Sequence, residues 1–425
     1  MGNNHHVVIV GGGFGGLYAA QSLKNAPFQI TLIDRRNFHL FQPLLYQVAT
    51  GWLSPANIAS TLRSVLRHQK NARVLLAEAV DFNIAKREVI LDNGTVAYDT
   101  LLVAAGSGYH YFGNENWRQL APGLKTIEDA TDMRRRIFSA FEAAERSTDN
   151  DRTRAQLTFM IVGGGPTGVE LAGALAEISR DILRADFRNI DPADAKILLL
   201  EAADRILAPY PTALSQKAES FLRDLGVTVQ TNTLVTAIEK GAVTLKHGDA
   251  MERIPCETVL WAAGVRASPL GAVLAKRSGA ELDRGGRIIV EPDLSLPNHP
   301  EIYVIGDMAN CSHQNGQPLP GVAPVAMQQG RYIAKCIIHR STGKATPAFR
   351  YHDRGNLAII GRARAVADLG RVRLAGYWAW LAWLFIHLLY LVEFENRVLV
   401  LIQWGWYYFR RNRAARLITK NKPDC

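Results

Sequence analysis

Two glycine-rich segments of the same kind carry residue types and a spacing suited to binding nucleotides. The first reads Gly11-Gly-Gly-Phe-Gly-Gly16, and the second, about 150 residues later, reads Gly163-Gly-Gly-Pro-Thr-Gly168. Both fit the pattern G-x-G-x-x-G, in which bare backbone and a helix N-terminus receive a pyrophosphate. One such pattern is a weak signal. Two of them predict two dinucleotides bound side by side, and therefore electrons passed between them.

The elements around each segment support this interpretation, because each segment follows a β-branched run and precedes a helical pattern. The first glycine permits the tight turn, the second lets the pyrophosphate approach, and the third lets helix and strand pack closely. In each unit the next strand ends in an acidic residue that can accept a hydrogen bond from ribose hydroxyls. That residue is Asp34 in the first unit and Glu201 in the second, where residues 179–194 leave room for extra helix and loop.

Two later strands end in the same small residues, which predicts two nested copies of one domain. Residues 101–107 end Ala-Ala-Gly-Ser, and residues 260–265 repeat the Ala-Ala-Gly pattern. A further strand, 302–307, ends in Gly306-Asp307, and an amphipathic helix follows from about Val325 to His339. The chain order predicts that the second copy is inserted into the first. Residues 89–91 and 96–98 read as a hairpin with an Asn-Gly turn.

The composition of the chain limits the kinds of site and the cellular compartment that we expect. The chain has 425 residues, a net charge of +10 and four cysteines without a C-x-x-C pair. We therefore expect no dithiol centre, no metal site and a reducing compartment. The first strand begins near Val7, so we expect no signal or transit peptide.

The C-terminal segment has the composition of a lipid-binding region. Residues 374–392 are apolar except for His387, and residues 398–409 form a second apolar run rich in Trp and Tyr. Basic residues follow, from Arg410 to Lys422. Tryptophan within an apolar run is typical of the bilayer interface, and the charges favour anionic lipid over nucleic acid. A buried dimer interface is the alternative for the apolar runs.

Together these residues resemble the two-dinucleotide flavoproteins and, more narrowly, the type II NADH dehydrogenases, which are non-proton-pumping NADH:quinone oxidoreductases. The most specific parts are residues 41–51, 163–170, 306–307 and 323–329, and the Trp-rich tail. The resemblance implies that the first glycine unit holds FAD and the second holds NADH. It also implies that Asp307 contacts the ribityl chain, and that an Ala-Gln-x-Ala-x-Gln motif lines the quinone site. The chain departs from that motif at Pro324 and keeps its second glutamine, Gln328, with Gln329 beside it.

These considerations give a set of expected site residues. For FAD they are Gly11, Gly13, Phe14, Gly15, Gly16, Asp34, Arg35, Gln42, Pro43, Leu44, Ala105, Gly106, Gly306 and Asp307. For NADH they are Gly163, Gly165, Gly168, Glu201, Ala263 and Gly264. For catalysis they are Glu170, Gln328 and Gln329. We expect Glu170 in the first turn of its helix, where the dipole favours the ionised carboxylate.

The leading hypothesis is an FAD-dependent NADH:quinone oxidoreductase. A sulfide:quinone oxidoreductase is the runner-up, but it needs two cysteines near the flavin. A soluble ferredoxin reductase has no use for the tail. A non-enzymatic NADH-sensing flavoprotein remains an alternative, although a lipid-facing tail favours a lipid-soluble substrate.

The expected fold is α/β, with two Rossmann-like dinucleotide-binding domains and a C-terminal helical membrane anchor. We expect the FAD domain over 1–115 and 286–350, the NADH domain over 116–285, and the membrane-association region over 351–425. The resemblance implies a monotopic attachment, with two helices in one leaflet, on the cytoplasmic face of a bacterial inner membrane. The expected partners are membrane lipid, quinone and a second copy in a homodimer, with no nucleic acid.

Overall fold

The computed structural model describes residues 5–410 and 415–418 and divides the chain into two compact units. Unit 1 contains residues 1–40, 59–108 and 265–353, and unit 2 contains residues 41–58, 109–264 and 354–425. The sequence prediction assigned residues 41–58 to the first domain, whereas they cluster here with unit 2. Each unit is described by itself below.

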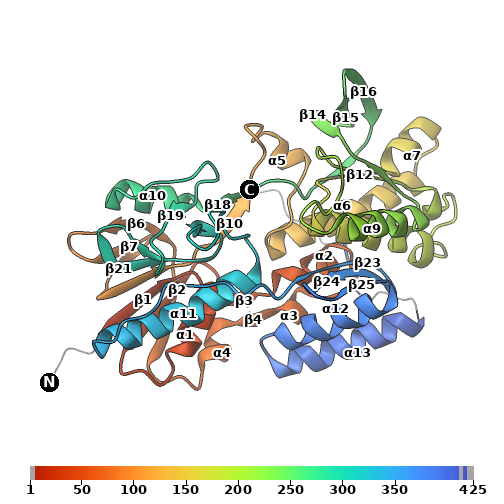
Figure 1. Ribbon diagram of the computed structural model, residues 1–425. Helices are drawn as coiled ribbons and strands as arrows, with labels where there is room; N and C mark the ends of the chain where they lie inside the picture. Colours follow the sequence, from red (N-terminus) through yellow and green to blue (C-terminus); the bar gives the residue numbers. More distant parts are fainter. Residues whose placement is uncertain (1–4, 411–414, 419–425) are drawn as a thin grey trace. The chain divides into compact units, whose positions relative to one another are not determined.

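Unit 1 is built on a six-stranded sheet in the order β20-β21-β9-β1-β2-β5 (Figure 1). Its strands are β1 (His6–Val10), β2 (Gln29–Asp34), β5 (Ala72–Leu76), β9 (Thr100–Val103), β20 (Ser295–Leu296) and β21 (His299–Val304). All neighbouring pairs are parallel except β20 with β21. Because β1 lies between β2 and β9, its carboxyl end opens at the point where the strand order reverses, which is where such sheets bind ligands.

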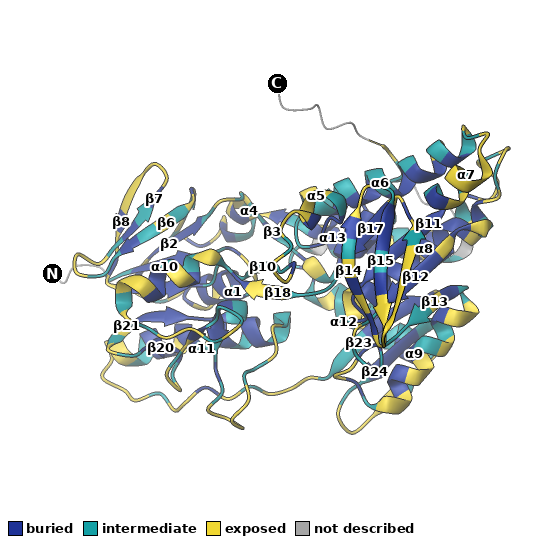
Figure 2. Cartoon of the chain, turned by 90° about the horizontal axis from the view of Figure 1, so that it is seen from above, coloured by how far each residue is buried: buried dark blue, intermediate teal, exposed yellow. Residues whose placement is uncertain are grey.

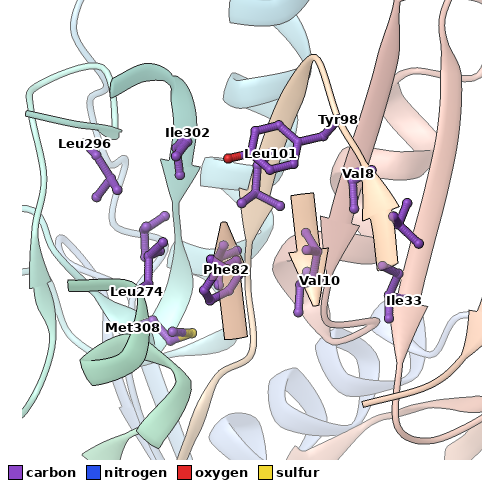
Figure 3. Packing of buried hydrophobic residues seen from close by; sticks show 14 of the residues in the cluster. Val8, Val10, Ile33, Phe82, Tyr98, Leu101, Leu274, Leu296, Ile302 and Met308 are labelled. Carbon is purple, nitrogen blue, oxygen red and sulfur yellow. The ribbon is translucent and has the colours of Figure 1, made fainter. Parts of the chain in front are cut away.

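One face of this sheet carries a continuous apolar core, because strands buried on both faces need near-continuous apolar sequence. Val8, Val10 and Leu101 point from the sheet toward Phe82 and Met308 (Figure 3). Phe82 comes from the antiparallel sheet of β6 (Ala79–Asn83), β7 (Glu88–Leu91) and β8 (Gly94–Ala97). Its β7–β8 pairing, with Leu91 opposite Gly94, confirms the predicted Asn-Gly hairpin.

Two helices of unit 1 pack closely against each other. Helix α1 (Phe14–Ser22) packs against α11 (Ala323–Ser341). The contact is close because Gly330 brings the backbone of α11 against the carbonyl of Gly15. The remaining elements are β3 (Phe38–Leu40), β4 (Ala59–Thr61), α4 (Leu62–Leu66), α10 (Pro269–Ser278), β19 (Ile288–Ile289), η4 (Gly306–Met308) and β22 (Ala309–Asn310).

Unit 2 repeats the same construction, as the paired glycine segments predict. Its parallel sheet has the order β13-β12-β11-β17, with β11 (Thr158–Val162), β12 (Lys196–Leu200), β13 (Val227–Gln230) and β17 (Thr258–Trp261). Strands β14 (Thr233–Glu239), β15 (Ala242–His247) and β16 (Ala250–Pro255) form a three-stranded antiparallel sheet, the counterpart of β6–β8. Figure 2 shows β11, β12 and β17 as buried strands.

The helices of unit 2 include α8 (Pro166–Glu177), which follows the second glycine segment. The long connection after α8 contains a π-helix, η2 (Ile178–Ile182), and a short 3-10 helix, η3 (Pro192–Asp194), which confirms the predicted extra helix and loop. The other helices of this unit before residue 354 are η1 (Gln42–Leu44), α2 (Leu45–Ala49), α3 (Pro55–Ile58), α5 (Trp117–Leu120), α6 (Ile127–Glu145), α7 (Asn150–Gln156) and α9 (Thr212–Asp224). Strands β10 (Ser107–Tyr109) and β18 (Val265–Ala267), whose residues belong to unit 1 except for Tyr109, form a two-stranded sheet.

The C-terminal segment of unit 2 is a small sheet followed by two helices, which lie side by side in Figure 1. Strands β23 (Asn356–Gly361), β24 (Arg364–Asp368) and β25 (Arg373–Ala375) were not predicted. The apolar run 374–392 forms a helix only over α12 (Tyr377–Tyr390), and α13 spans Phe394–Arg410. Among the helices that the structure describes, none is long and apolar enough to cross a bilayer.

Candidate functional site

The first glycine segment forms a tight turn whose middle glycine faces open space. The Gly11 N–H donates to the Ile33 carbonyl at 2.8 Å, and Gly11 has a φ of +106° that favours glycine. A β-carbon on Gly16 would collide with the Gly11 carbonyl. At Gly13, by contrast, a β-carbon would meet no protein atom within 4 Å. No described protein atom therefore requires glycine at this position, and the space beside it is open.

The carboxylate of Asp34 closes the same turn. Its Oδ2 accepts from the Gly12 N–H at 2.6 Å, and its Oδ1 accepts from the Arg36 N–H at 2.7 Å. Burial raises the pKa of Asp34, while these two N–H groups oppose the shift. The carboxylate is thereby fixed at the end of β2 beside the turn, as the spacing predicts.

The second segment repeats this geometry. The Gly163 N–H donates to the Leu200 carbonyl at 2.8 Å. Glu201 Oε2 accepts from the Gly164 N–H at 2.6 Å, and Oε1 accepts from the Ala203 N–H at 2.8 Å. A β-carbon on Gly165 would again meet no protein atom within 4 Å. The two turns are therefore equivalent in geometry, and each is called a cradle below.

The strand ends that follow lie against the two turns. In unit 1, the Ala104 N–H donates to Val10, and Gly106 has a φ of +68°. In unit 2, the Ala262 N–H donates to Val162, and Gly264, next to Ala263, has a φ of +67°.

Asp307 and Gln329 each accept a hydrogen bond near the Gly306-Asp307 turn of unit 1. The Ser107 hydroxyl donates to Asp307 Oδ2 at 2.5 Å, and Gln329 Oε1 accepts from the Gly306 N–H at 2.7 Å. Ser107 belongs to the strand end that sequence analysis selected, but its hydroxyl was not recognised as a partner of Asp307. Gln329 is almost fully buried.

The side chain of Gln328 instead forms two hydrogen bonds with the backbone of His352. Its Nε2 donates to the His352 carbonyl at 2.9 Å, and its Oε1 accepts from the His352 N–H at 3.0 Å. The structure thus separates the side chains of the two predicted catalytic glutamines. Pro324, the departure from the family motif, lies in the first turn of α11, where a missing N–H breaks no helical bond.

The other predicted FAD residues differ in the contacts that their side chains make. Phe14 begins α1 and packs edge-on against His39, with ring centroids 5.0 Å apart. Arg35 forms an exposed ion pair with Glu78 at 3.7 Å. Residues 42–44 form η1 in unit 2, where Gln42 donates to the Lys125 carbonyl at 3.2 Å.

A small aromatic cavity of about 50 Å³, partly open to solvent, lies within unit 2. It is enclosed by α2, α8, β23 and the two C-terminal helices, and its lining includes Gln47, Glu170, Glu177, Trp380, Trp383 and Trp404. The indole N–H of Trp404 donates to Gln47 Oε1 at 2.9 Å, which attaches α13 to α2.

Glu170 is a buried acid of this cavity, and the prediction that it lies in the first turn of its helix was wrong. It is the fifth residue of α8, beyond the first turn, so the helix N-terminus stabilises its charge only weakly. Burial raises the pKa of Glu170 well above its usual range, and the contacts with the Ile359 N–H and the Trp383 side chain offset only part of that effect. Removal from water disfavours the carboxylate form of Glu170.

Sequence reasoning missed several residues of the cavity. Trp383, Trp404 and Gln47 were seen only as members of apolar or amide-rich runs, and Glu177 was not selected. The signal that was available is the spacing of Glu170 and Glu177, seven residues apart on a helix that is otherwise apolar.

Two family models match successive parts of the chain. Residues 5–330 match the family model of the pyridine nucleotide-disulphide oxidoreductases, which is the class that the two cradles define. Residues 353–411 match the NDH2 C-terminal domain. The chain belongs to the type II NADH:quinone oxidoreductases within that class.

Relatives support this assignment over nearly the whole chain. It is 47% identical to the type II NADH:quinone oxidoreductase NdhA of Mycobacterium tuberculosis, covering 99% of this chain and 90% of that protein. It is 45% identical to Ndh of the same organism, covering 98% and 90%. The structure of NDH2 from Plasmodium falciparum in complex with NADH has the same fold, with a TM-score of 0.89 at 19% identity, covering 98% of this chain and 100% of that one.

Proposed function

We propose that this type II NADH:quinone oxidoreductase oxidises NADH with a non-covalently bound FAD and reduces a membrane quinone without pumping protons. The observation that carries the proposal is the pair of equivalent cradles, in which Gly13 and Gly165 alone face open space. The first cradle takes the FAD pyrophosphate and the second takes that of NADH.

The residues of unit 1 fit FAD. In this proposal Asp34 accepts from ribose hydroxyls, and Asp307, which accepts from the Ser107 hydroxyl, contacts the ribityl chain as the resemblance implies. The first turn of α1 supplies unpaired N–H groups for the phosphates. When bound, FAD supplies the two-electron chemistry that joins NADH to quinone. The contacts proposed for it are hydrogen bonds, so heating in acid should release it from the protein.

Glu201 is proposed to select NADH over NADPH. Its carboxylate lies where a 2′-phosphate would have to bind, and two like charges would repel. In Glu201→Gln, the single amide oxygen can accept from only one of the two N–H groups, Gly164 or Ala203, so circular dichroism must show that the variant is folded. We expect kcat/KM for NADPH to rise by about tenfold or more relative to NADH.

Steady-state kinetics with both nucleotides test this assignment. Glu239→Gln is a matched control, since Glu239 forms an exposed ion pair with Arg253 in the same unit. A wild-type protein that already uses both nucleotides equally at low concentration would contradict the role of Glu201.

The aromatic cavity is proposed as the quinone site. Its walls offer flat apolar surface to a ring, and Glu170 offers a proton to a quinone oxygen. The roles of Gln328 and Gln329 in quinone binding remain proposals that rest on the resemblance, since both amides bond within unit 1.

The cysteines argue against sulfide chemistry. Burial raises the pKa of the Cys256 thiol to about 12 and that of Cys311 to about 11. Cys336 is also buried, and its pKa is raised as well. Because the thiolate is the reactive form, these thiols are poor sulfur carriers. Cys425 lies outside the described residues.

Membrane attachment is proposed to use one exposed face of α12 and α13. On these helices the exposed apolar residues are Tyr377, Trp378, Phe385, Leu389, Val398, Leu399, Leu401, Ile402 and Trp406. Opposite residues such as Trp383 and Val400 are fully buried. This pattern supports monotopic attachment, which we place on the cytoplasmic face of a bacterial inner membrane. A reporter fused after Cys425 that is found across the membrane from the N-terminus would contradict it.

At least one arginine of the basic cluster that follows α13 is paired within the protein. Arg416 forms an ion pair with Asp186 of the same unit. Arg411, Arg413, Lys420 and Lys422 lie outside the described residues, and their role with anionic lipid remains a prediction. An apolar face is covered by lipid or by a second copy, so we also propose a homodimer. Sedimentation of the detergent-solubilised protein tests it, and a monomer would contradict it.

Substitutions on the exposed face test the membrane proposal. Trp378 is 69% exposed and Ile402 is 61% exposed. Each apolar side chain contributes about 1.5–3 kcal/mol when buried. We therefore expect the Trp378→Glu, Ile402→Glu protein to bind anionic vesicles about 100-fold more weakly.

Co-sedimentation with vesicles measures this effect. Met251→Glu is the control, because Met251 is 58% exposed on β16 of the same unit. Equal loss in the control and the double variant would mean that these two helices do not mediate attachment. Deleting the tail is a poorer test, because Trp383 and Trp404 are buried against the rest of unit 2.

A direct assay separates the candidate functions. Purified protein is mixed with a short-chain quinone and either NADH or sulfide. We expect quinol only with NADH. Quinol formed from sulfide would support the runner-up, and binding of NADH without turnover would support a sensor.

A further inference from the structure

Side chains hold both polar backbone groups of Gly12, the middle glycine of the first cradle. Asp34 Oδ2 accepts from the Gly12 N–H at 2.6 Å, and Nδ1 of His39 lies 3.0 Å from the Gly12 carbonyl oxygen. Gly12 is buried, whereas the next residue, Gly13, is exposed. The acidic residue belongs to the nucleotide-binding pattern, but that pattern contains no histidine. The function proposed above therefore leaves His39 without a role.

The imidazole of His39 is fixed in one tautomer. His39 is the middle residue of β3, opposite Ser60 of β4, and it is only 2% exposed. A carbonyl oxygen can only accept, so Nδ1 must carry the hydrogen and donate it to Gly12. Nε2 is then a bare acceptor, and it is buried without a hydrogen-bond partner among the described residues. The ring thus presents its single N–H to the glycine turn.

Burial also keeps this ring uncharged. It lowers the pKa of His39 to about 4, and the bond with the Gly12 backbone opposes only part of that effect. The cationic ring would carry a second N–H at Nε2, which has no acceptor in its buried position. At neutral pH the ring therefore acts as a neutral donor.

The bond from His39 sets the direction of the next amide. The Gly12 carbonyl and the Gly13 N–H belong to one trans peptide group, so they point in opposite directions. Because the carbonyl is directed at the buried imidazole, the Gly13 N–H is directed away from it. That N–H donates to no atom of the described residues, and the space beside Gly13 is open. It is available to a ligand in the first cradle.

The second cradle holds the equivalent carbonyl by different means. Glu201 accepts from the Gly164 N–H, as Asp34 does from Gly12, but the Gly164 carbonyl accepts from the Leu207 N–H at 2.8 Å. Leu207 is fully buried and has a φ of +49°, which is unusual for leucine. One unit thus uses a backbone donor and the other an imidazole. Two separate means of holding the same carbonyl indicate that its direction is needed in both cradles.

The sequence of the turn explains this need. Three glycines in a row, at positions 11–13, have the most permissive backbone that a chain can have. Without a donor from His39, the peptide between Gly12 and Gly13 could rotate among several orientations. A ligand would then have to order the turn when it binds, and its affinity would fall by that cost.

We propose that His39 is a positioning residue for FAD, which holds the Gly12 carbonyl so that the Gly13 N–H is directed at the pyrophosphate. The inference rests on the proposed assignment of the first cradle to FAD. His39 acts through Gly12 and does not itself contact the cofactor. The amide that it directs is one of the donors that a helix N-terminus offers to phosphate oxygens.

Three substitutions separate the hydrogen bond of His39 from the shape of its ring. The side-chain nitrogen of asparagine lies close to the place of Nδ1, and that of glutamine lies closer to the place of Nε2. His39→Asn therefore keeps a donor for the Gly12 carbonyl, His39→Gln displaces it, and His39→Leu removes it. His6→Leu is the matched control, because the His6 ring bonds to Thr31 at 2.8 Å but lies at the opposite end of β1.

The rate of FAD release is the readout. Each full-length protein is purified with its flavin and diluted, and the rise in free-flavin fluorescence is followed. We expect His39→Leu and His39→Gln to release FAD about tenfold faster or more than wild type. His39→Asn should stay within about threefold of wild type, and His6→Leu within about twofold. With FAD restored to saturation, KM for NADH should change less than about twofold, because the second cradle uses no histidine.

Wild-type release rates in both His39→Leu and His39→Gln would overturn the proposal. Equally fast release from His39→Asn and His39→Leu would also overturn it, because the ring and not its donor would then be required. If His39→Leu and His39→Gln do not fold, His39→Asn decides, and fast release from it contradicts the proposal. Failure of the FAD assignment is distinct, because wild-type protein would then release no flavin at all.

Discussion

Purified Gly13→Val protein is expected to be folded and colourless. Gly13 has a φ of −71° and a ψ of −164°, an extended conformation that any residue adopts, and its β-carbon direction is free of protein atoms. A valine side chain there would occupy the space proposed for the FAD pyrophosphate. We expect FAD affinity to fall at least about 100-fold, which corresponds to about 2.7 kcal/mol. Flavin absorbance per mole of purified protein measures it.

The matched variant is Gly165→Val in the second cradle, where φ is −71° and ψ is 179°. It should remain yellow and lose NADH binding instead. Circular dichroism of both variants should match that of wild type. Full flavin occupancy in Gly13→Val would contradict the assignment of the first cradle.

Glu170→Gln should lower quinone turnover by about 100-fold, because glutamine cannot donate a proton as an acid does. Ferricyanide reduction should be retained within about threefold. Since burial raises the pKa of Glu170, we expect the wild-type protein to lose quinone turnover as pH rises through that raised value. In Glu170→Gln this alkaline fall should be absent.

Thermal unfolding gives a second readout of the same group. The folded-state pKa of Glu170 lies above its unfolded value, so its contribution to stability is complete below the unfolded pKa and is lost as pH rises through the folded pKa. The Tm of wild type should therefore fall toward alkaline pH more than the Tm of Glu170→Gln. Parallel Tm curves would show that Glu170 is not held as a neutral acid.

The glycine turns could be predicted from sequence because they depend on short-range geometry. Gly11 and Gly16 constrain one another within six residues, and the carboxylate at the end of the next strand follows from the parallel pairing of two strands. The same local logic applies to the Asn-Gly hairpin at Gly94. Such features need no knowledge of distant segments.

The ionisation of Glu170 could not be predicted in this way. Its position in the helix was judged from the glycine pattern, but burial raises its pKa, and the cavity around it includes Trp383, more than 200 residues later. The C-terminal strands were missed for a related reason. Residues 356–375 alternate weakly and acquire strand structure by packing against α8 and α12. Long-range burial, rather than local pattern, determines both.

An anaerobic titration tests the central claim most directly. Purified protein is mixed with one equivalent of NADH and then with one equivalent of a short-chain quinone, while flavin absorbance is followed. The proposed function predicts loss of the yellow absorbance with NADH and its full recovery with quinone, together with one NAD⁺ and one quinol per flavin. Protein that lacks flavin, or whose flavin is bleached by NADH but is not restored by quinone, would contradict it.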